Sequence, residues 1–405
     1  MSNRFPFPDE NSITRLEFEN GMVLLIYPNP TVKSVTLFGA LRAGSLYENP
    51  VRNGLASLTA AALMRGTRTR DFDALYGTLE DIGADLGFSA GRHSISFAGR
   101  ALAEDLPVLI DVLEDVLRRP SFPVDPVDKL RTRRLTELNY SQYDTRYRAT
   151  RAFREALYPD HHPYHYSTYG SPMTLPNLVT DNLRDFHRKH YGPDGMVTVI
   201  VGAVKPDDVI EMVGGKLADW SNLNQPDAPI LPAIHSPDKT ERLYTGIPGK
   251  SQTSIVMGTL GPSRLNQDYN AAIVANSILG EFGLMGRIGD VVREQLGLAY
   301  YAYSRIEGGS GPGTWAIEAG VAPDDVELTL EKICDEIRRI VSEPVSDDDL
   351  ADNQSYFTGR LPLRLEDSDG IAATLMALER YGLGLNYIHN YHETIYALTK
   401  SDLQS

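Results

Sequence analysis

Arg293 and Tyr300 are the residues of this sequence whose types and spacing point most directly to chemistry. They lie in the segment Val292–Tyr301, which reads VREQLGLAYY. A guanidinium is always charged and grips carbonyl or carboxylate oxygens with its fork of N–H groups. A phenol donates a hydrogen bond to developing negative charge. The alternative is a surface arginine and a half-buried tyrosine at an ordinary helix–strand junction.

The spacing of apolar residues predicts the local structure around this pair. A helix is expected through Arg287–Gln295, and Gly297 is expected to end it because glycine takes a left-handed cap with little strain. Residues Leu298–Ser304 are expected to form a strand. This arrangement would allow both side chains to face one cavity.

A glycine-rich segment lies just upstream, in the sequence GEFGLMGR. Gly280, Gly283 and Gly286 would let a substrate backbone pass close to the chain, and the alternative is a flexible turn between helices. The segment fits neither of the glycine patterns that bind phosphate.

The nine histidines show no zinc motif. Neither H-x-x-E-H nor H-E-x-x-H occurs, and we interpret the histidines as hydrogen-bonded or solvated residues and not as ligands. The members of the three local groups are His161, His162 and His165; His187 and His190; and His389 and His392.

Two further candidates for nucleophilic chemistry are rejected on context. Gly87–Gly91 has the letters of G-x-S-x-G, but that motif needs a strand before it and a helix after it; here a glycine-rich turn is expected. Cys334, the single cysteine, is predicted to be a core thiol in an amphipathic helix. One cysteine also excludes an intrachain disulfide and fits a reducing compartment.

The sequence contains an internal repeat at an offset of 220 residues, which relates the two halves of the chain. Residues 101–120 align without a gap with residues 321–340, and the strand-like Ser34–Gly39 aligns with Ser254–Thr259. We therefore predict an α+β fold of two homologous domains, each an antiparallel sheet packed with helices. The expected limits are residues 1–225, a proline-containing linker at 226–240, and residues 241–405.

The pattern of apolar residues gives the elements expected in the first half. The expected strands are Met22–Tyr27, Ser34–Leu41, Ser94–Ala98 and Met196–Val201; the expected helices are Gly54–Met64, Phe72–Ile82, Leu102–Arg118 and Val127–Ala156.

Composition limits the class of protein. A length of 405 residues predicts more than one domain, and the formal charge of −15 argues against nucleic acid or an anionic membrane as the main partner. No N-terminal apolar segment or run of about 18 apolar residues is present. We expect a cytoplasmic protein, although a periplasmic relative with its signal removed would look the same.

The segment Gly54–Thr67, together with the sequence around Arg293, resembles the insulinase/pitrilysin peptidases, the inverted zincins. In that family a Gly-Leu-Ala lead-in precedes His-x-x-Glu-His, and a Gly-Thr pair follows it. The resemblance covers nearly the whole chain. Its other segments are Leu24–Ser45, Leu102–Pro123, His161–Ser171 and Tyr191–Gly202.

The resemblance implies that the metal chemistry of the family is missing here. Ser57, Ala60 and Ala61 stand where it places the two histidine ligands and the glutamate. Glu137 stands near the expected position of the last zinc carboxylate, and we interpret it as a relic. No metal is expected in this chain.

The same resemblance implies a role for the chain as a non-catalytic subunit. In the family an Arg–Tyr pair at the spacing of Arg293 and Tyr300 reaches toward a zinc site in another domain or subunit, and a glycine-rich loop helps to admit substrate. The implied partner is a homologous zinc-bearing subunit and the implied ligand a peptide, with homodimers left open. The competing hypothesis is a structural or chaperone-like chamber subunit without a peptidase role.

Overall fold

The computed structural model describes residues 7–404, which divide into two compact units. Each unit draws on both halves of the chain. The first contains the described residues up to Leu138, Tyr166–Ile230 and Pro362–His389, and the second contains Asn139–His165, Leu231–Leu361 and the described residues from Asn390.

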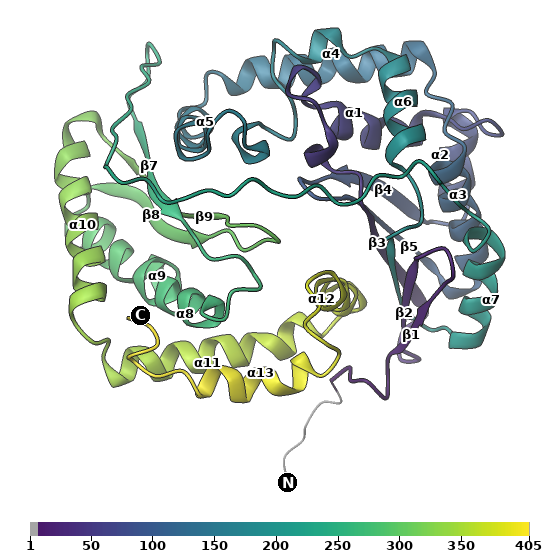
Figure 1. Cartoon of the computed structure of the whole chain (residues 1–405). Coiled ribbons are helices and arrows are strands. Elements are labelled where there is room, and N and C mark those ends of the chain that lie inside the picture. Colours follow the sequence, from purple (N-terminus) through teal and green to yellow (C-terminus); the bar gives the residue numbers. More distant parts are fainter. Residues whose placement is uncertain (1–6, 405) are drawn as a thin grey trace. The chain divides into compact units, whose positions relative to one another are not determined.

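Most of the helices and strands are labelled in Figure 1. The strands are β1 Thr14–Glu17, β2 Val23–Pro28, β3 Ser34–Leu41, β4 Asp85–Ala90, β5 Ile95–Leu102, β6 Val197–Gly202, β7 Thr253–Leu260, β8 Ala299–Ile306 and β9 Thr314–Val321. The helices are α1 Leu55–Ala62, α2 Phe72–Glu80, α3 Leu106–Arg118, α4 Val124–Ser141, α5 Thr145–Leu157, α6 Thr180–His190, α7 Pro206–Leu217, α8 Tyr269–Gly280, α9 Phe282–Gly289, α10 Val326–Ser342, α11 Asp347–Arg364, α12 Ser368–Arg380 and α13 Tyr387–Tyr396.

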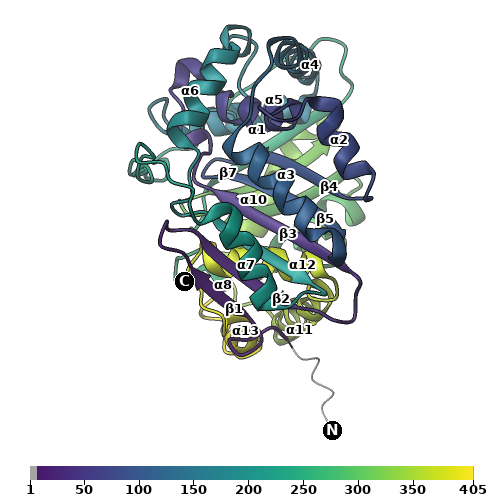
Figure 2. The same cartoon turned by 90° about the vertical axis from the view of Figure 1, so that its right-hand side faces the viewer.

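The first unit is built on a six-stranded sheet in the order β1-β2-β6-β3-β5-β4. All of its pairs are antiparallel except β2 with β6. Successive side chains of a strand point to opposite faces, and in β3 the buried Val35, Leu37 and Leu41 point toward the main core. The helices α2, α3 and α7 lie over this face (Figure 2).

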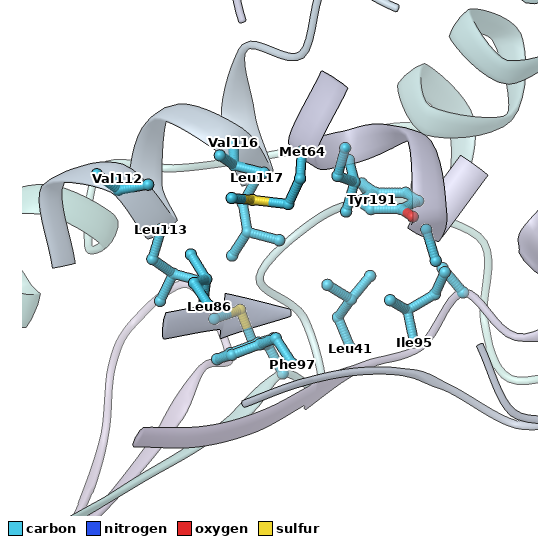
Figure 3. Close-up of a cluster of buried hydrophobic side chains, with 14 of the residues drawn as sticks. Leu41, Met64, Leu86, Ile95, Phe97, Val112, Leu113, Val116, Leu117 and Tyr191 are labelled. Atoms are coloured by element: carbon cyan, nitrogen blue, oxygen red, sulfur yellow. The ribbon is translucent and has the colours of Figure 1, made fainter. Parts of the chain in front are cut away.

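Aliphatic side chains from helices and strands fill this core (Figure 3). Leu113 and Leu117 of α3 belong to the same buried cluster as Leu41 and Ile95 of the strands, and all four side chains are almost completely buried. A buried leucine contributes about 1.5–3 kcal/mol relative to an exposed one. Packing of this face therefore holds α1 and α3 in fixed positions on the sheet.

The opposite face of the same sheet is covered by α12, a helix from the second half of the chain. It packs on β3 and β6 with the buried Ile371 and Leu375. At its start Asp369 accepts hydrogen bonds of 2.9 Å each from Thr36 Oγ1 and from Arg100 Nε. The first half of the chain does not complete the first unit alone.

The second unit repeats this plan with the order β7-β9-β8, all antiparallel. One face packs on α8 and α9 through Ile255, Ala302 and Ile317. The other face is covered by α5, a helix from the first half, which packs on β7. Arg146 of α5 donates a 2.7 Å hydrogen bond to Glu318 on this face.

The predicted α+β fold of two related halves is confirmed. The strand trio β3-β5-β4 of the first unit corresponds to β7-β9-β8 of the second. A short 3₁₀ turn precedes α3 at Ala103–Asp105 and precedes α10 at Pro323–Asp325, at the predicted offset of 220 residues. The helices α5 and α12 also occupy corresponding places, so each half supplies this helix to the other unit.

Two predicted elements were wrong. Gly87–Gly91, expected as a turn, is mostly strand: Asp85–Ala90 pairs with β5 along its whole length. The strand was not recognised because small residues in this segment obscure the alternation of apolar and polar positions. The single helix expected over Val127–Ala156 is two helices, and the side chain of Asp144 caps the second by accepting a 2.6 Å bond from Tyr147 N.

Among residues 7–404, no single helix is long and apolar enough to cross a membrane. Together, α8 and the following segment Phe282–Gln295 have the length and composition of a membrane-spanning helix, but the two segments are bent by 79°. Cys334 of α10 is partly buried and forms no disulfide.

Candidate functional site

Two glycines and one glutamate fix the helix that resembles the zinc helix. Gly54 precedes α1 with φ +95°, and a Cβ there would come within 2.8 Å of Gly170 Cα. Glu48 caps the helix by accepting bonds from Ala56 N at 2.5 Å and Gly54 N at 3.0 Å. Gly66 ends the segment with φ +141°. The glycines of the frame are therefore required by backbone geometry, whatever the residues between them.

Burial raises the pKa of Glu48 to about 7, against the lowering effect of the hydrogen bonds that it accepts. The residue is partly buried, and its carboxyl group faces the start of α1, where less water is available to stabilise its charge.

The three positions expected for ligands and base carry no metal-binding side chain. Ser57 and Ala60 are only 2% and 1% exposed, and Ala61 is partly buried. The oxygen of Ser57 accepts a 2.5 Å hydrogen bond from Nη1 of Arg134 on α4. A serine, two alanines and a guanidinium do not fit Zn²⁺, which needs deprotonated nitrogen, sulfur or carboxylate ligands.

Arg134 is partly buried, and desolvation lowers the pKa of its guanidinium. Its Cζ lies 5.8 Å from the centre of the Tyr169 ring, which is within the range of a cation–π interaction. Sequence inspection missed Arg134. Its position in the sequence could have identified it. Arg134 lies three residues before Glu137, and residues three apart are neighbours on a helix surface.

Glu137 lies on the exposed side of α4. Its side chain is 65% exposed, and its Oε1 lies 3.6 Å from Nε of Arg133. It stays a proposed relic of a ligand.

The histidines occupy ordinary structural places. His187 Nε2 lies 2.8 Å from the carbonyl oxygen of Leu117, and His190 packs 4.6 Å from the ring of Phe186. Burial lowers the pKa of each of these rings to about 4. Among the residues that the structure describes, no three His, Cys, Asp or Glu side chains are grouped so that they could hold a metal ion.

Arg293 lies in a π-helical turn, Asp290–Gln295, and not in the regular helix expected there. Its side chain is 35% exposed, with Nε 3.4 Å from Glu294 Oε1. The following Gly297 has φ +65°, as expected for the glycine that ends the helical segment. Single π turns are often found at functional sites.

Tyr300 lies at a second irregularity. In the pairing of β8 with β9, Ala299 faces Val321 and Tyr301 faces Gly320, so Tyr300 is an extra residue in a β-bulge. Its side chain is 81% exposed. A bulge re-aims a side chain out of the regular alternation of a strand. The π turn packs on β8, so the elements that carry Arg293 and Tyr300 are neighbours within one unit.

The three glycines of the upstream segment have different surroundings. A Cβ on Gly280 would come within 2.4 Å of Ser304 N, and one on Gly286 would come within 2.5 Å of Gly280 N. Gly283 has open space around it and φ +63°. The backbone from Gly283 to Gly286 is non-helical and includes Met285 at φ +75°. Only Gly283 combines an exposed position with room beside it.

Comparison with known proteins gives this arrangement a family. Residues 23–168 match the model of insulinase, peptidase family M16, and residues 177–356 match the model of the peptidase M16 inactive domain. An uncharacterised zinc protease of Streptomyces coelicolor is 27% identical over 369 residues, covering 89% of this chain and 79% of the relative. An uncharacterised zinc protease of Bacillus subtilis is 23% identical over 357 residues, covering 88% of this chain and 85% of the relative.

Solved structures agree on the fold. A peptidase M16 inactive domain from Pseudomonas fluorescens superposes with a TM-score of 0.88 at 24% identity, covering 97% of this chain and 93% of that one. A protease from Helicobacter pylori superposes with a TM-score of 0.90 at 17% identity, covering 98% and 95%. Because the two family models match successive parts of the chain and extend over most of it, the chain belongs to the insulinase family of peptidases, M16.

Proposed function

We propose that this chain is a non-catalytic subunit of a heteromeric zinc metallopeptidase and that it contributes Arg293 and Tyr300 to the zinc site of a homologous partner. The observation that carries the proposal is the pairing of Arg134 with Ser57 at 2.5 Å. A guanidinium and a serine occupy the helix face from which the family holds its metal. Hydrolysis by a metal therefore has to come from a second chain.

The positions of the partly buried Arg293 and the exposed Tyr300 support the second part of the proposal. Each stands at a backbone irregularity and neither is buried in the core of its unit. When a peptide carbonyl is attacked, its oxygen gains negative charge. The guanidinium of Arg293 and the phenol of Tyr300 donate hydrogen bonds to that oxygen.

The remaining parts of the proposal concern the substrate, the location of the zinc and the cellular compartment. The ligand is a peptide, and the exposed Gly283 lets its backbone approach, whereas Gly280 and Gly286 serve packing. The zinc belongs to the partner subunit, which carries H-x-x-E-H. The complex acts in the cytoplasm.

The test is steady-state kinetics of the chain reconstituted with an H-x-x-E-H relative from the same genome. Arg293→Ala and Tyr300→Phe are each expected to lower turnover by about 10²–10³, the usual loss for one donor to an oxyanion. The matched controls are Arg338→Ala, with a side chain 71% exposed on α10, and Tyr244→Phe, which is 90% exposed. Both controls should keep wild-type turnover.

Metal analysis accompanies the kinetics. The isolated chain is expected to hold no stoichiometric zinc after dialysis and to leave peptides uncleaved. Wild-type turnover in both Arg293→Ala and Tyr300→Phe, with the complex intact, would instead favour a chamber subunit without a peptidase role.

A further inference from the structure

The charge of Arg134 is the least explained feature of the vacated zinc position. Helix α4 carries three arginines. Arg131 pairs with Asp128 at 3.0 Å and Arg133 pairs with Glu137 at 3.6 Å. Arg134 has no carboxylate within 4.0 Å among residues 7–404, although it is more enclosed than Arg133.

The contacts of Arg134 hold the guanidinium in place without neutralising it. One N–H group of Nη1 is bonded to the buried Ser57, and the ring of Tyr169 lies 5.8 Å from Cζ. Serine and tyrosine orient the guanidinium, and neither brings a full negative charge. The exposed carboxylate of Glu137 attracts the guanidinium but forms no direct ion pair with it. A partly desolvated cation without a direct ion pair attracts an anion more strongly than one in bulk water does.

The shape of the free donors selects the anion. A guanidinium presents five N–H donors in a planar fork that matches a carboxylate with two parallel hydrogen bonds. Ala60 and Ala61 add no competing charge on the neighbouring turn of α1. Beside Ser57, where the resemblance places the first zinc ligand, this chain therefore holds a single fixed positive charge with unused N–H donors.

We propose that Arg134, oriented by Ser57, forms a binding site for a peptide carboxylate on the ligand face of α1. The inference depends on the proposed function only in taking the carboxylate to belong to a peptide. It requires no partner subunit and no zinc, so it can fail while the proposed function holds, and the reverse is also true.

The experiment measures binding of three short peptides to the isolated full chain by calorimetric titration. The probes are an N-acetylated pentapeptide of glycine and alanine as the free acid, the same peptide as a C-terminal amide, and the amide with one internal glutamate. The free acid is expected to bind about 10- to 100-fold more tightly than the plain amide, as for one hydrogen-bonded charged group. Tight binding of the glutamate peptide would extend the site to side-chain carboxylates, and weak binding would restrict it to the C-terminus.

Variants locate the effect. Arg134→Gln is expected to reduce the preference for the free acid to about one, and Arg134→Lys, which keeps the charge but not the fork, to leave an intermediate preference. Arg133→Gln, on the same helix, should keep the full preference. Thermal melts verify folding, and Arg134→Lys carries the test should Arg134→Gln fail to fold. No binding of any peptide by the wild-type chain, equal binding of acid and amide, or an unchanged preference in the Arg134 variants would overturn the proposal.

Discussion

The hydrogen bond between Arg134 and Ser57 determines what restoring the missing ligands would achieve. The triple variant Ser57→His, Ala60→Glu, Ala61→His rebuilds the family motif but leaves a guanidinium beside it. Repulsion between Zn²⁺ and a cation about 4 Å away amounts to several kcal/mol at the effective dielectric of a protein. We expect no stoichiometric zinc in the triple variant and recovery of zinc binding when Arg134→Ala is added, measured by metal analysis after dialysis.

The control is a quadruple variant with Arg133→Ala in place of Arg134→Ala. It tests whether zinc binding depends on the charge beside Ser57 or on the total positive charge of α4. Arg133 lies beside Arg134 but pairs with Glu137. This variant should stay without zinc. Stoichiometric zinc in the triple variant would contradict the view that Arg134 excludes the metal.

His187 makes stability depend on pH. Its pKa is about 4 in the folded chain against an ordinary value of 6.5, chiefly because of burial. Between these values the unfolded chain holds the proton and the folded chain does not. The contribution of His187 is therefore complete above pH 6.5 and falls by about 1.4 kcal/mol per pH unit as the pH drops toward 4.

His187→Gln, which keeps a donor for the Leu117 carbonyl, is expected to flatten this decline relative to the wild type in urea unfolding at pH 7.5, 6 and 5. The control is His161→Gln, at a side chain that is 67% exposed. Glu48, with its raised pKa, acts in the opposite direction over an overlapping range, so the difference between variants is the informative quantity. Equal slopes for wild type and His187→Gln would contradict the prediction.

At this scale the sequence revealed which residues were missing but not what replaced them. Ser57, Ala60 and Ala61 can be recognised from the spacing of the frame. Arg134 lies 77 residues from Ser57 in the sequence. Only the packing of α4 beside α1 brings their atoms together, and no local pattern carries that information.

Two glycines of the segment before Arg293 allow a matched test of how tightly this segment packs. Gly286 and Gly283 have φ values of +64° and +63°, and they differ in the space around them. Gly283, with ψ −124°, lies in a backbone region that other residues rarely adopt. Gly283→Ala is expected to cost only this backbone strain, about 1–3 kcal/mol. Gly286→Ala adds a Cβ 2.5 Å from Gly280 N and should cost clearly more.

Thermal and urea unfolding of the two variants measure this difference. Equal losses would mean that the segment relaxes and that Gly286 is not needed for packing. If Gly283→Ala also lowers turnover of the reconstituted complex without further loss of stability, the exposed glycine contributes to substrate binding.

Elements with one strong pattern were predicted well, and elements with mixed signals were not. The bounds of β3 match the prediction residue for residue, because its apolar run is long and bounded by turn residues. The π turn at Arg293 and the bulge at Tyr300 were not predicted. The π turn and the bulge each insert a residue into a regular repeat, and the spacing of apolar residues does not record such an insertion.

The exchange of α5 and α12 gives a prediction for the whole molecule. A fragment of residues 1–230 contains the first sheet but lacks α12, so its β3–β6 face, with the buried Leu25 and Val199, has no cover. We expect this fragment to aggregate or to melt without cooperativity when expressed alone. Co-expression with residues 231–405 should restore a cooperative melt, measured by circular dichroism. A stable, cooperative fragment 1–230 would show that α12 is dispensable.

The duplication was visible in the sequence, but the exchange was not. Apolar spacing at a constant offset identifies equivalent helices. It does not say on which sheet a helix packs, because α5 and α12 are equivalent helices and the two sheets are equivalent as well. The choice depends on contacts such as those of Asp369 with Thr36 and Arg100.

Because α5 and α12 are exchanged, the segment without helix or strand between α7 and β7 acts as a tether between each sheet and its covering helix. While the chain is intact, each sheet meets its covering helix at an effective concentration in the millimolar range that a tether typically provides. A single cut in this segment makes the same association bimolecular. The melting temperature of the cut protein would then rise with protein concentration, whereas that of the intact chain would not.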